Sequence, residues 1–186
     1  MKAVRDGAAV WLTPAALICG AIALAARPPA TVGALVVTGV VGVVGAVMPL
    51  RSRSTPSESR GRIASLRWLE AVGLGVAAFA LARRIEAPFL PIPISSLTVA
   101  GNVLAAVAEE LFFRRLMYGW LLPGGTGLAV GGAAATFAAV HVPAYGAAVL
   151  PIDFAAGLLF GWQRWATGGW SASAVTHVAA NLLQLR

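Results

Sequence analysis

Charged residues are scarce in this sequence, where Asp, Glu, Lys and Arg make up 11% of the 186 residues. A soluble domain usually carries about 25% charged residues. Hydrophobic residues reach 59%, whereas a disordered chain requires low hydrophobicity. The composition therefore excludes an ordinary soluble domain and a disordered chain, and it indicates an integral membrane protein.

Cysteine and acidic residues are rarer still. Cys19 is the only cysteine, so the chain cannot form an intrachain disulfide. Seven acidic residues stand against fourteen Lys and Arg, which gives a net charge of +7. In a soluble protein this excess suggests nucleic-acid binding, but here the basic residues flank apolar segments, where they set orientation and meet anionic lipid. We therefore expect no nucleic-acid partner, and we expect anionic lipid to bind the Arg-rich segment 51–67.

Runs without charge predict the first membrane-spanning helices. Residues 8–26 and 28–50 contain no charged residue, and each run is long enough to cross about 30 Å of hydrocarbon as a helix. The first run is long for a signal peptide and is followed at once by the second, so we interpret it as an uncleaved helix. A third, shorter span is expected over 68–82. The positive-inside rule then predicts that the N-terminus and the loop 51–67 are cytoplasmic.

Proline and glycine turns divide the second half of the chain into further helices. We expect these helices over residues 96–122, 128–142, 148–165 and 170–185. The whole pattern predicts an all-α, polytopic transmembrane bundle of about seven helices. We divide it into N-terminal helices, residues 1–95, and a helical core, residues 96–186, which holds every candidate site residue.

Ionisable residues inside the apolar helices of the core predict a site within the membrane. They are Glu109, Glu110, His141 and His177. An ionisable side chain at the centre of a bilayer costs about 3 kcal/mol, and such residues usually face the interior of a bundle and serve function. A single histidine of this kind is as readily a hydrogen-bonded packing residue, but the four residues together favour a site.

Helix geometry separates the roles of the two glutamates. Glu110 and Arg114 are four residues apart with the acid first, the favourable order for an ion pair on one helix face. Glu109 points about 100° away and has no partner in its own helix. A carboxylate without a partner in an apolar site holds a proton more readily, which suits a general base. We therefore predict that Glu109 is the reactive acid and Glu110 its support, and we interpret Arg115 as a membrane-edge charge that snorkels.

Each histidine has a neighbour four residues away on the same helix face. Phe137 precedes His141, so its ring can shield the imidazole. Asn181 follows His177, which places an imidazole and an amide side by side. Two N–H donors in this arrangement suit a developing oxyanion. The alternative role of this pair is hydrogen bonding between helices, which is common in membranes.

Three motifs in these helices resemble those of a known family. Residues 109–114 (EELFFR) match EExxxR, residues 137–141 (FAAVH) match FxxxH, and residues 177–181 (HVAAN) match HxxxN. They occur in that order on separate helices, with a glycine-bearing segment, 157–168, before the last. Together they resemble the CPBP family of intramembrane proteases, the CAAX proteases and bacteriocin-processing enzymes also called the Abi family. The resemblance covers about residues 96–186.

This resemblance implies a membrane-embedded glutamic endopeptidase that needs no cofactor. Its substrate would be a membrane-associated protein or peptide. By analogy with the family, Glu109 and His141 would hold and activate a water, while His177 and Asn181 would stabilise the oxyanion.

Two further motif residues, Glu110 and Arg114, would fix the catalytic helix. The Ala-, Arg- and Gly-rich composition is typical of a high-GC bacterium. We therefore expect the protein in the bacterial cytoplasmic membrane, where prenylated CAAX substrates are not expected.

Three alternatives remain open at this stage. A zinc-dependent intramembrane protease could use Glu109, His141 and His177 as ligands with an open position for water, although no HExxH motif occurs. A non-catalytic immunity or scaffold protein could keep the same fold. A transporter could use buried acids and histidines as a proton relay, but the sequence shows no inverted repeat of hydropathy. We favour the metal-free protease, because zinc ligation would leave Asn181 without an evident task.

Overall fold

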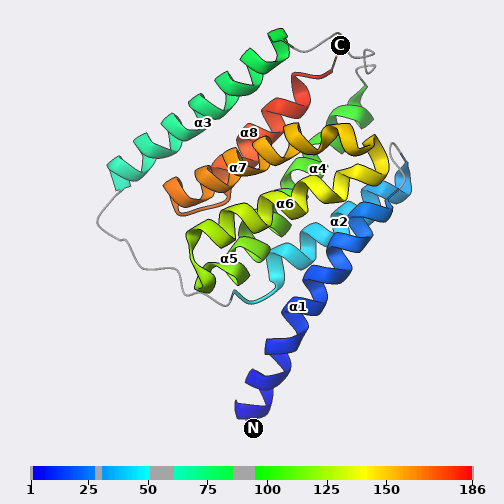
Figure 1. Ribbon diagram of the computed structural model, residues 1–186, viewed down its shortest axis with the longest axis vertical. Coiled ribbons are helices and arrows are strands. Elements are labelled where there is room, and N and C mark those ends of the chain that lie inside the picture. Colours follow the sequence, from blue (N-terminus) through cyan, green and yellow to red (C-terminus); the bar gives the residue numbers. More distant parts are fainter. Residues whose placement is uncertain (1, 28–30, 51–60, 86–94, 186) are drawn as a thin grey trace.

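The elements of the computed structural model are helices, and the structure describes residues 2–27, 31–50, 61–85 and 95–185 (Figure 1). The main helices are α1 (Lys2–Ala26), α2 (Val32–Val47), α3 (Gly61–Ile85), α4 (Ser96–Glu110), α5 (Tyr118–Leu121), α6 (Thr126–Tyr145), α7 (Leu150–Thr167) and α8 (Ser171–Leu182). The π-helix η1 (Leu111–Met117) joins α4 directly to α5, and short 3-10 turns, η2 (Leu122–Gly124) and η3 (Ala147–Val149), follow α5 and precede α7. Counting α4, η1 and α5 as one run gives seven helices, so the predicted fold class is confirmed.

Three of these helical runs are long and apolar enough to cross a membrane. They cover residues 64–84, 96–124 and 126–145, and α1 and α2 add shorter apolar stretches over 12–26 and 32–47. One face of α2 exposes a row of valines, namely Val32, Val36, Val40, Val43 and Val47. A soluble protein rarely exposes so large an apolar patch, whereas lipid covers such a face readily. The chain is a membrane protein.

Helix α3 is longer than the sequence predicted. We expected a short span over 68–82 after a loop at 51–67, but α3 begins at Gly61 and ends at Ile85. Arginine is a good helix former, so the helix extends beyond the apolar residues into the basic ones that were expected to end it. The prediction for residues 51–60, including the binding of anionic lipid there, lies outside the described residues.

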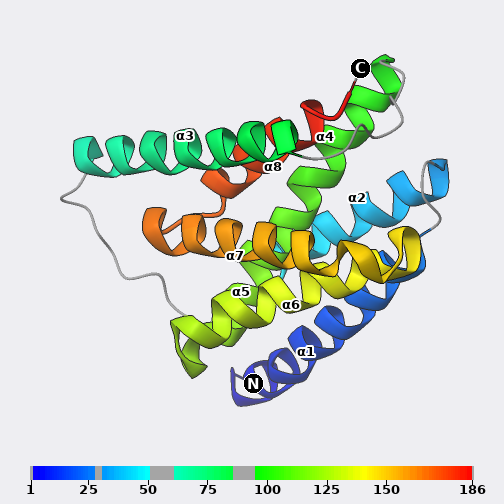
Figure 2. The ribbon, with the colours of Figure 1, turned by 45° about the horizontal axis from the view of Figure 1, so that its top comes forward.

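The bundle places α3 along one edge and α1 along the opposite edge, with α4 between α2 and α8 (Figures 1 and 2). In Figure 2, α4 crosses the direction of α6 and α7, so its C-terminal end reaches the middle of the bundle. The core cluster there consists of Leu17, Leu24, Val41, Phe112, Phe113, Leu116, Met117, Ala133, Phe137, Val140 and Phe160. The helix that carries the predicted glutamates thus ends inside the apolar core.

Two glycines let α2 approach this helix closely. A Cβ on Gly42 would lie 2.7 Å from the Cβ of Ala108, and a Cβ on Gly45 would lie 2.7 Å from the carbonyl oxygen of Leu111. Real Cβ atoms do not approach this closely. Small residues allow such backbone contact between membrane helices, and here the contact holds α2 against α4 and η1.

Candidate active site

The two predicted glutamates lie in the last turn of α4, just before η1. Both are buried, with exposures of 3% for Glu109 and 0% for Glu110. The sequence analysis assumed a regular α-helix through Arg114, but the chain winds as a π-helix from Leu111 to Met117. Such π-segments occur frequently at functional sites.

The ion pair predicted between Glu110 and Arg114 is confirmed. Arg114 Nη1 donates to Glu110 Oε1 at 3.0 Å, and both side chains are fully buried. Arg114 Nη2 also donates to the carbonyl of Gly157 at 3.2 Å. The guanidinium carbon lies 4.6 Å from the ring centroid of Phe137 and 5.0 Å from that of Phe160. These contacts lock Arg114 between α4, α6 and α7.

Glu109 faces both histidines with one oxygen and the guanidinium of Arg27 with the other. Its Oε2 lies 3.8 Å from His141 Nε2 and 3.9 Å from His177 Nε2. Its Oε1 accepts from Arg27 Nη2 at 2.5 Å. The expectation that Glu109 has no partner in its own helix agrees with this geometry, but the expectation of an unpaired carboxylate is wrong. Arg27 supplies the partner from the end of α1, 82 residues away in the chain.

The imidazole of His141 is held from two sides. Its Nδ1 lies 2.8 Å from the carbonyl oxygen of Phe137, and its ring centroid lies 4.8 Å from the phenyl ring of that residue. The predicted shielding by Phe137 is therefore confirmed. Because a carbonyl oxygen can only accept, Nδ1 carries the hydrogen, and in the neutral imidazole Nε2 is then the acceptor atom on the side of Glu109. Asp153 Oδ2 lies 3.7 Å from the same Nδ1.

The second histidine lies against Glu110. His177 Nδ1 is 3.0 Å from Glu110 Oε1, and its ring stacks on Phe160 with centroids 4.8 Å apart. Asn181 Nδ2 donates to the backbone carbonyl of Asn102 at 3.4 Å. The amide thus bonds between α8 and α4, and its role toward an oxyanion stays a prediction.

Arg115 binds the C-terminal end of α2, and its interpretation as a membrane-edge charge stays a prediction. Its Nη1 donates to the carbonyl of Gly45 at 2.5 Å and to that of Met48 at 3.2 Å. The last carbonyls of a helix lack intrahelical partners and attract a cation. The sequence does not reveal that α2 ends beside Arg115, and this long-range contact decides the position of the side chain.

The sequence analysis missed two residues beside the site, Arg27 and Asp153. The sequence does mark both residues, because each is an isolated charge. Arg27 is the only charged residue between positions 8 and 50, and Asp153 is the only acidic residue after Glu110. An isolated charge within apolar sequence marks a functional position by default.

The candidate zinc ligands do not fit a metal site as the structure places them. Among the described residues, no three His, Cys, Asp or Glu side chains form a group able to hold a metal. Arg27 Nη2 lies 2.5 Å from Glu109 Oε1 and 3.5 Å from His141 Nε2, close to two of the three proposed ligands. A guanidinium in this position would repel a divalent cation.

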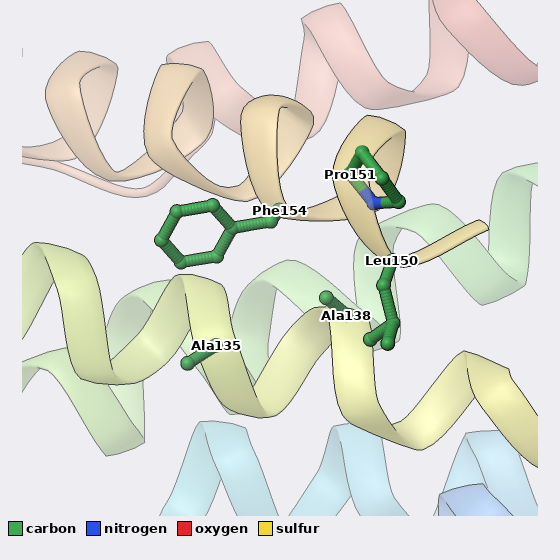
Figure 3. Close-up of a pocket in the computed structure, with 5 residues that line it drawn as sticks. All are labelled: Ala135, Ala138, Leu150, Pro151 and Phe154. Atoms are coloured by element: carbon green, nitrogen blue, oxygen red, sulfur yellow. The ribbon is translucent and has the colours of Figure 1, made fainter. Parts of the chain in front are cut away.

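An apolar pocket of about 380 Å³ lies between α6 and the start of α7 (Figure 3). It is lined by Ala135, Ala138, Leu150, Pro151 and Phe154. The lining offers no ionisable side chain, so the pocket has no group for acid–base chemistry. The chemistry lies instead with the buried cluster around Glu109.

A known protein family matches the part of the chain that carries this cluster. The family described as type II CAAX prenyl endopeptidase Rce1-like matches residues 91–183, half of the chain. No curated protein and no solved structure matches the chain. The matched residues include all six predicted site residues, namely Glu109, Glu110, Arg114, His141, His177 and Asn181. The chain therefore belongs to the Rce1-like type II CAAX prenyl endopeptidase family.

Proposed function

We propose that this protein is an intramembrane endopeptidase in which Glu109 and His141 activate a water for attack on a peptide bond. One observation carries the proposal. A buried carboxylate oxygen, Glu109 Oε2, faces the Nε2 atoms of His141 and His177 at 3.8 and 3.9 Å. These three residues come from α4, α6 and α8, and the family to which the chain belongs is one of proteases.

The spacing of these atoms suits a shared water. Distances of 3.8 and 3.9 Å are too long for direct hydrogen bonds, and polar groups separated in this way commonly share a bridging water. A water hydrogen-bonded to Glu109 Oε2 and His141 Nε2 is held by two acceptors. Glu109 takes the proton as the hydroxyl oxygen bonds to the substrate carbonyl carbon.

The oxyanion that forms requires donors on the opposite side of the carbonyl. His177 Nδ1 faces the carboxylate of Glu110 at 3.0 Å and therefore carries a hydrogen. His177 Nε2 can therefore donate to the oxyanion only when the ring is an imidazolium. Asn181 supplies the second donor by exchanging its long bond to the Asn102 carbonyl for the oxyanion.

Asn181→Ala should lower kcat by about 10²–10³, the usual cost of removing one oxyanion donor, with little change in KM. The measurement is a steady-state assay of the purified protein. Asn102→Ala is the matched control, because the side chain of Asn102 bonds within its own helix, to the carbonyl of Thr98. An unchanged kcat in Asn181→Ala would restrict this residue to packing between helices.

Catalysis by this route needs no metal, so activity should survive exhaustive chelation. Glu109 serves as the base and Arg27 supplies the positive charge beside it, so the route uses no Lewis acid. Elemental analysis of active protein, combined with activity after chelation, measures the requirement. Stoichiometric zinc whose removal stops turnover and whose return restores it would contradict the metal-free mechanism.

The proposed substrate is a membrane-associated protein or peptide, and the proposed location is the bacterial cytoplasmic membrane with the N-terminus in the cytoplasm. The burial of the site supports such a substrate, because Glu109 is only 3% exposed and lies near the middle of the helical run 96–124, which is long enough to span the membrane. The basic residues at the N-terminus support the orientation through the positive-inside rule.

A further inference from the structure

The proposed active site includes a cation from outside the part of the chain that matches the family. Arg27 follows the last residue of α1, whereas the family match begins at residue 91. Its side chain is nevertheless only 14% exposed and contacts Glu109. The predicted motifs give this residue no role, although it touches the residue on which the mechanism depends.

Three contacts fix the guanidinium of Arg27. Its Nη2 donates to Glu109 Oε1 at 2.5 Å and lies 3.5 Å from His141 Nε2. Its Nη1 donates to the hydroxyl of Thr38 at 3.1 Å, and Thr38 is 2% exposed on α2. Because Oε1 is held in this way, Oε2 is the oxygen that faces both histidines. Arg27 therefore fixes the orientation in which the carboxylate presents its other oxygen to the water.

The arginine and glutamate charges of the cluster form two neutral pairs. Arg114 pairs with Glu110 at 3.0 Å, and Arg27 pairs with Glu109 at 2.5 Å. Among the described residues, Arg27 is the arginine or lysine that forms an ion pair with Glu109. A buried charge without a partner is costly inside a membrane, so Glu109 depends on Arg27 to stay ionised at this depth.

The same cation serves both stages of the reaction. As the water attacks, its proton passes to Glu109, its oxygen bonds to the carbonyl carbon, and the electron pair of the C=O bond moves to the oxyanion. The negative charge leaves Glu109 and appears on the substrate, and the total charge of the site does not change. A cation beside Glu109 balances the carboxylate before the step and acts electrostatically on the oxyanion after it.

We propose that Arg27 is the positioning residue and counter-charge of Glu109, through which the N-terminal helices complete the active site. This inference rests on the proposed function. It assigns a role in catalysis to α1 and α2, which the family match does not cover.

Activity of Arg27 variants tests the role. We expect Arg27→Gln to lower kcat by about 10²-fold with little change in KM. Arg27→Lys should lower kcat less, because lysine keeps the positive charge although it lacks the planar guanidinium group. In Arg27→Ala, millimolar guanidinium ion should restore part of kcat, whereas the same concentration of potassium chloride should not. Arg84→Gln, an exposed arginine at the end of α3, is the matched control. Unchanged or increased kcat in Arg27→Gln, or equal effects of the two salts in Arg27→Ala, would overturn the proposal.

A stability measurement tests the contact without reference to activity. Unfolding in detergent is compared for Arg27→Gln, Glu109→Gln and the double variant. We expect the double variant to lose less stability than the sum of the single variants, because each single variant leaves one buried charge without a partner. Additive losses would overturn the ion pair. A wild-type protein without protease activity would overturn the proposed function and the catalytic role of Arg27. The comparison of the single and double variants would still decide whether Arg27 and Glu109 pair.

Discussion

Glu109→Gln is expected to abolish hydrolysis while the protein still folds and inserts into the membrane. The amide keeps the shape of the side chain and can still accept from Arg27, but it cannot take a proton from the water. General bases contribute about 10²–10⁴ to the rate, and we expect the upper end here because Glu109 Oε2 is the carboxylate oxygen between both histidines. The measurement is kcat of the purified variant in detergent or reconstituted vesicles.

A matched control for this variant is Glu70→Gln, which makes the same chemical change at an exposed position of α3. The control should retain wild-type turnover. If Glu109→Gln retained it as well, the assignment of the general base would be wrong, and the cluster around Glu109 would be a packing arrangement.

Glu110→Gln is expected to cause the largest loss of stability. Glu110 and Arg114 are both 0% exposed, so the variant leaves a guanidinium charge buried without its anion. Breaking a buried ion pair in this way costs about 3–5 kcal/mol of unfolding free energy. The loss should exceed that of Glu109→Gln, because Arg27, the partner of Glu109, remains 14% exposed. Denaturation of the purified variants in detergent measures both values.

The double variant Glu110→Gln with Arg114→Met provides the control for this prediction. It removes both charges, so it should recover part of the stability that Glu110→Gln loses. The interpretation that the ion pair of Glu110 with Arg114 stabilises the fold would be contradicted if Glu110→Gln had the unfolding free energy of the wild type. It would also be contradicted if the double variant were less stable than the sum of the two single variants predicts.

Contacts within one helix could be predicted from the sequence, because the helical repeat fixes them. The pair of Glu110 with Arg114 and the pair of Phe137 with His141 are each four residues apart, and both are observed. The number of helices followed in the same way from the lengths of the apolar runs. These features depend only on local geometry and composition.

Contacts between distant helices could not be predicted. Arg27 reaches Glu109 over 82 residues, and Arg115 reaches the carbonyl of Gly45 over 70. A basic residue at the end of an apolar run looks the same whether it faces a lipid headgroup or turns into the bundle. The packing of α1 and α2 against α4 and η1 decides between the two, and no local pattern in the sequence encodes that packing.

The π-helix η1 is a further feature that periodicity does not reveal. Within it, the carbonyl of Arg114 accepts from Arg164 Nε of α7 at 3.1 Å. Arg164 in turn lies over the ring of Tyr118 at 4.9 Å. A side chain 50 residues later in the chain thus contacts the backbone of η1, and the periodicity of the sequence does not predict this contact.

Hydrolysis in ¹⁸O-labelled water tests most directly the central claim that this protein is an endopeptidase dependent on Glu109. Purified wild-type protein and the Glu109→Gln variant are each incubated with membrane proteins, and the new peptide ends are identified by mass spectrometry. We predict new C-terminal carboxylates that carry ¹⁸O with the wild type and none with the variant. Labelled ends of equal abundance with both proteins, or with neither, would contradict the account.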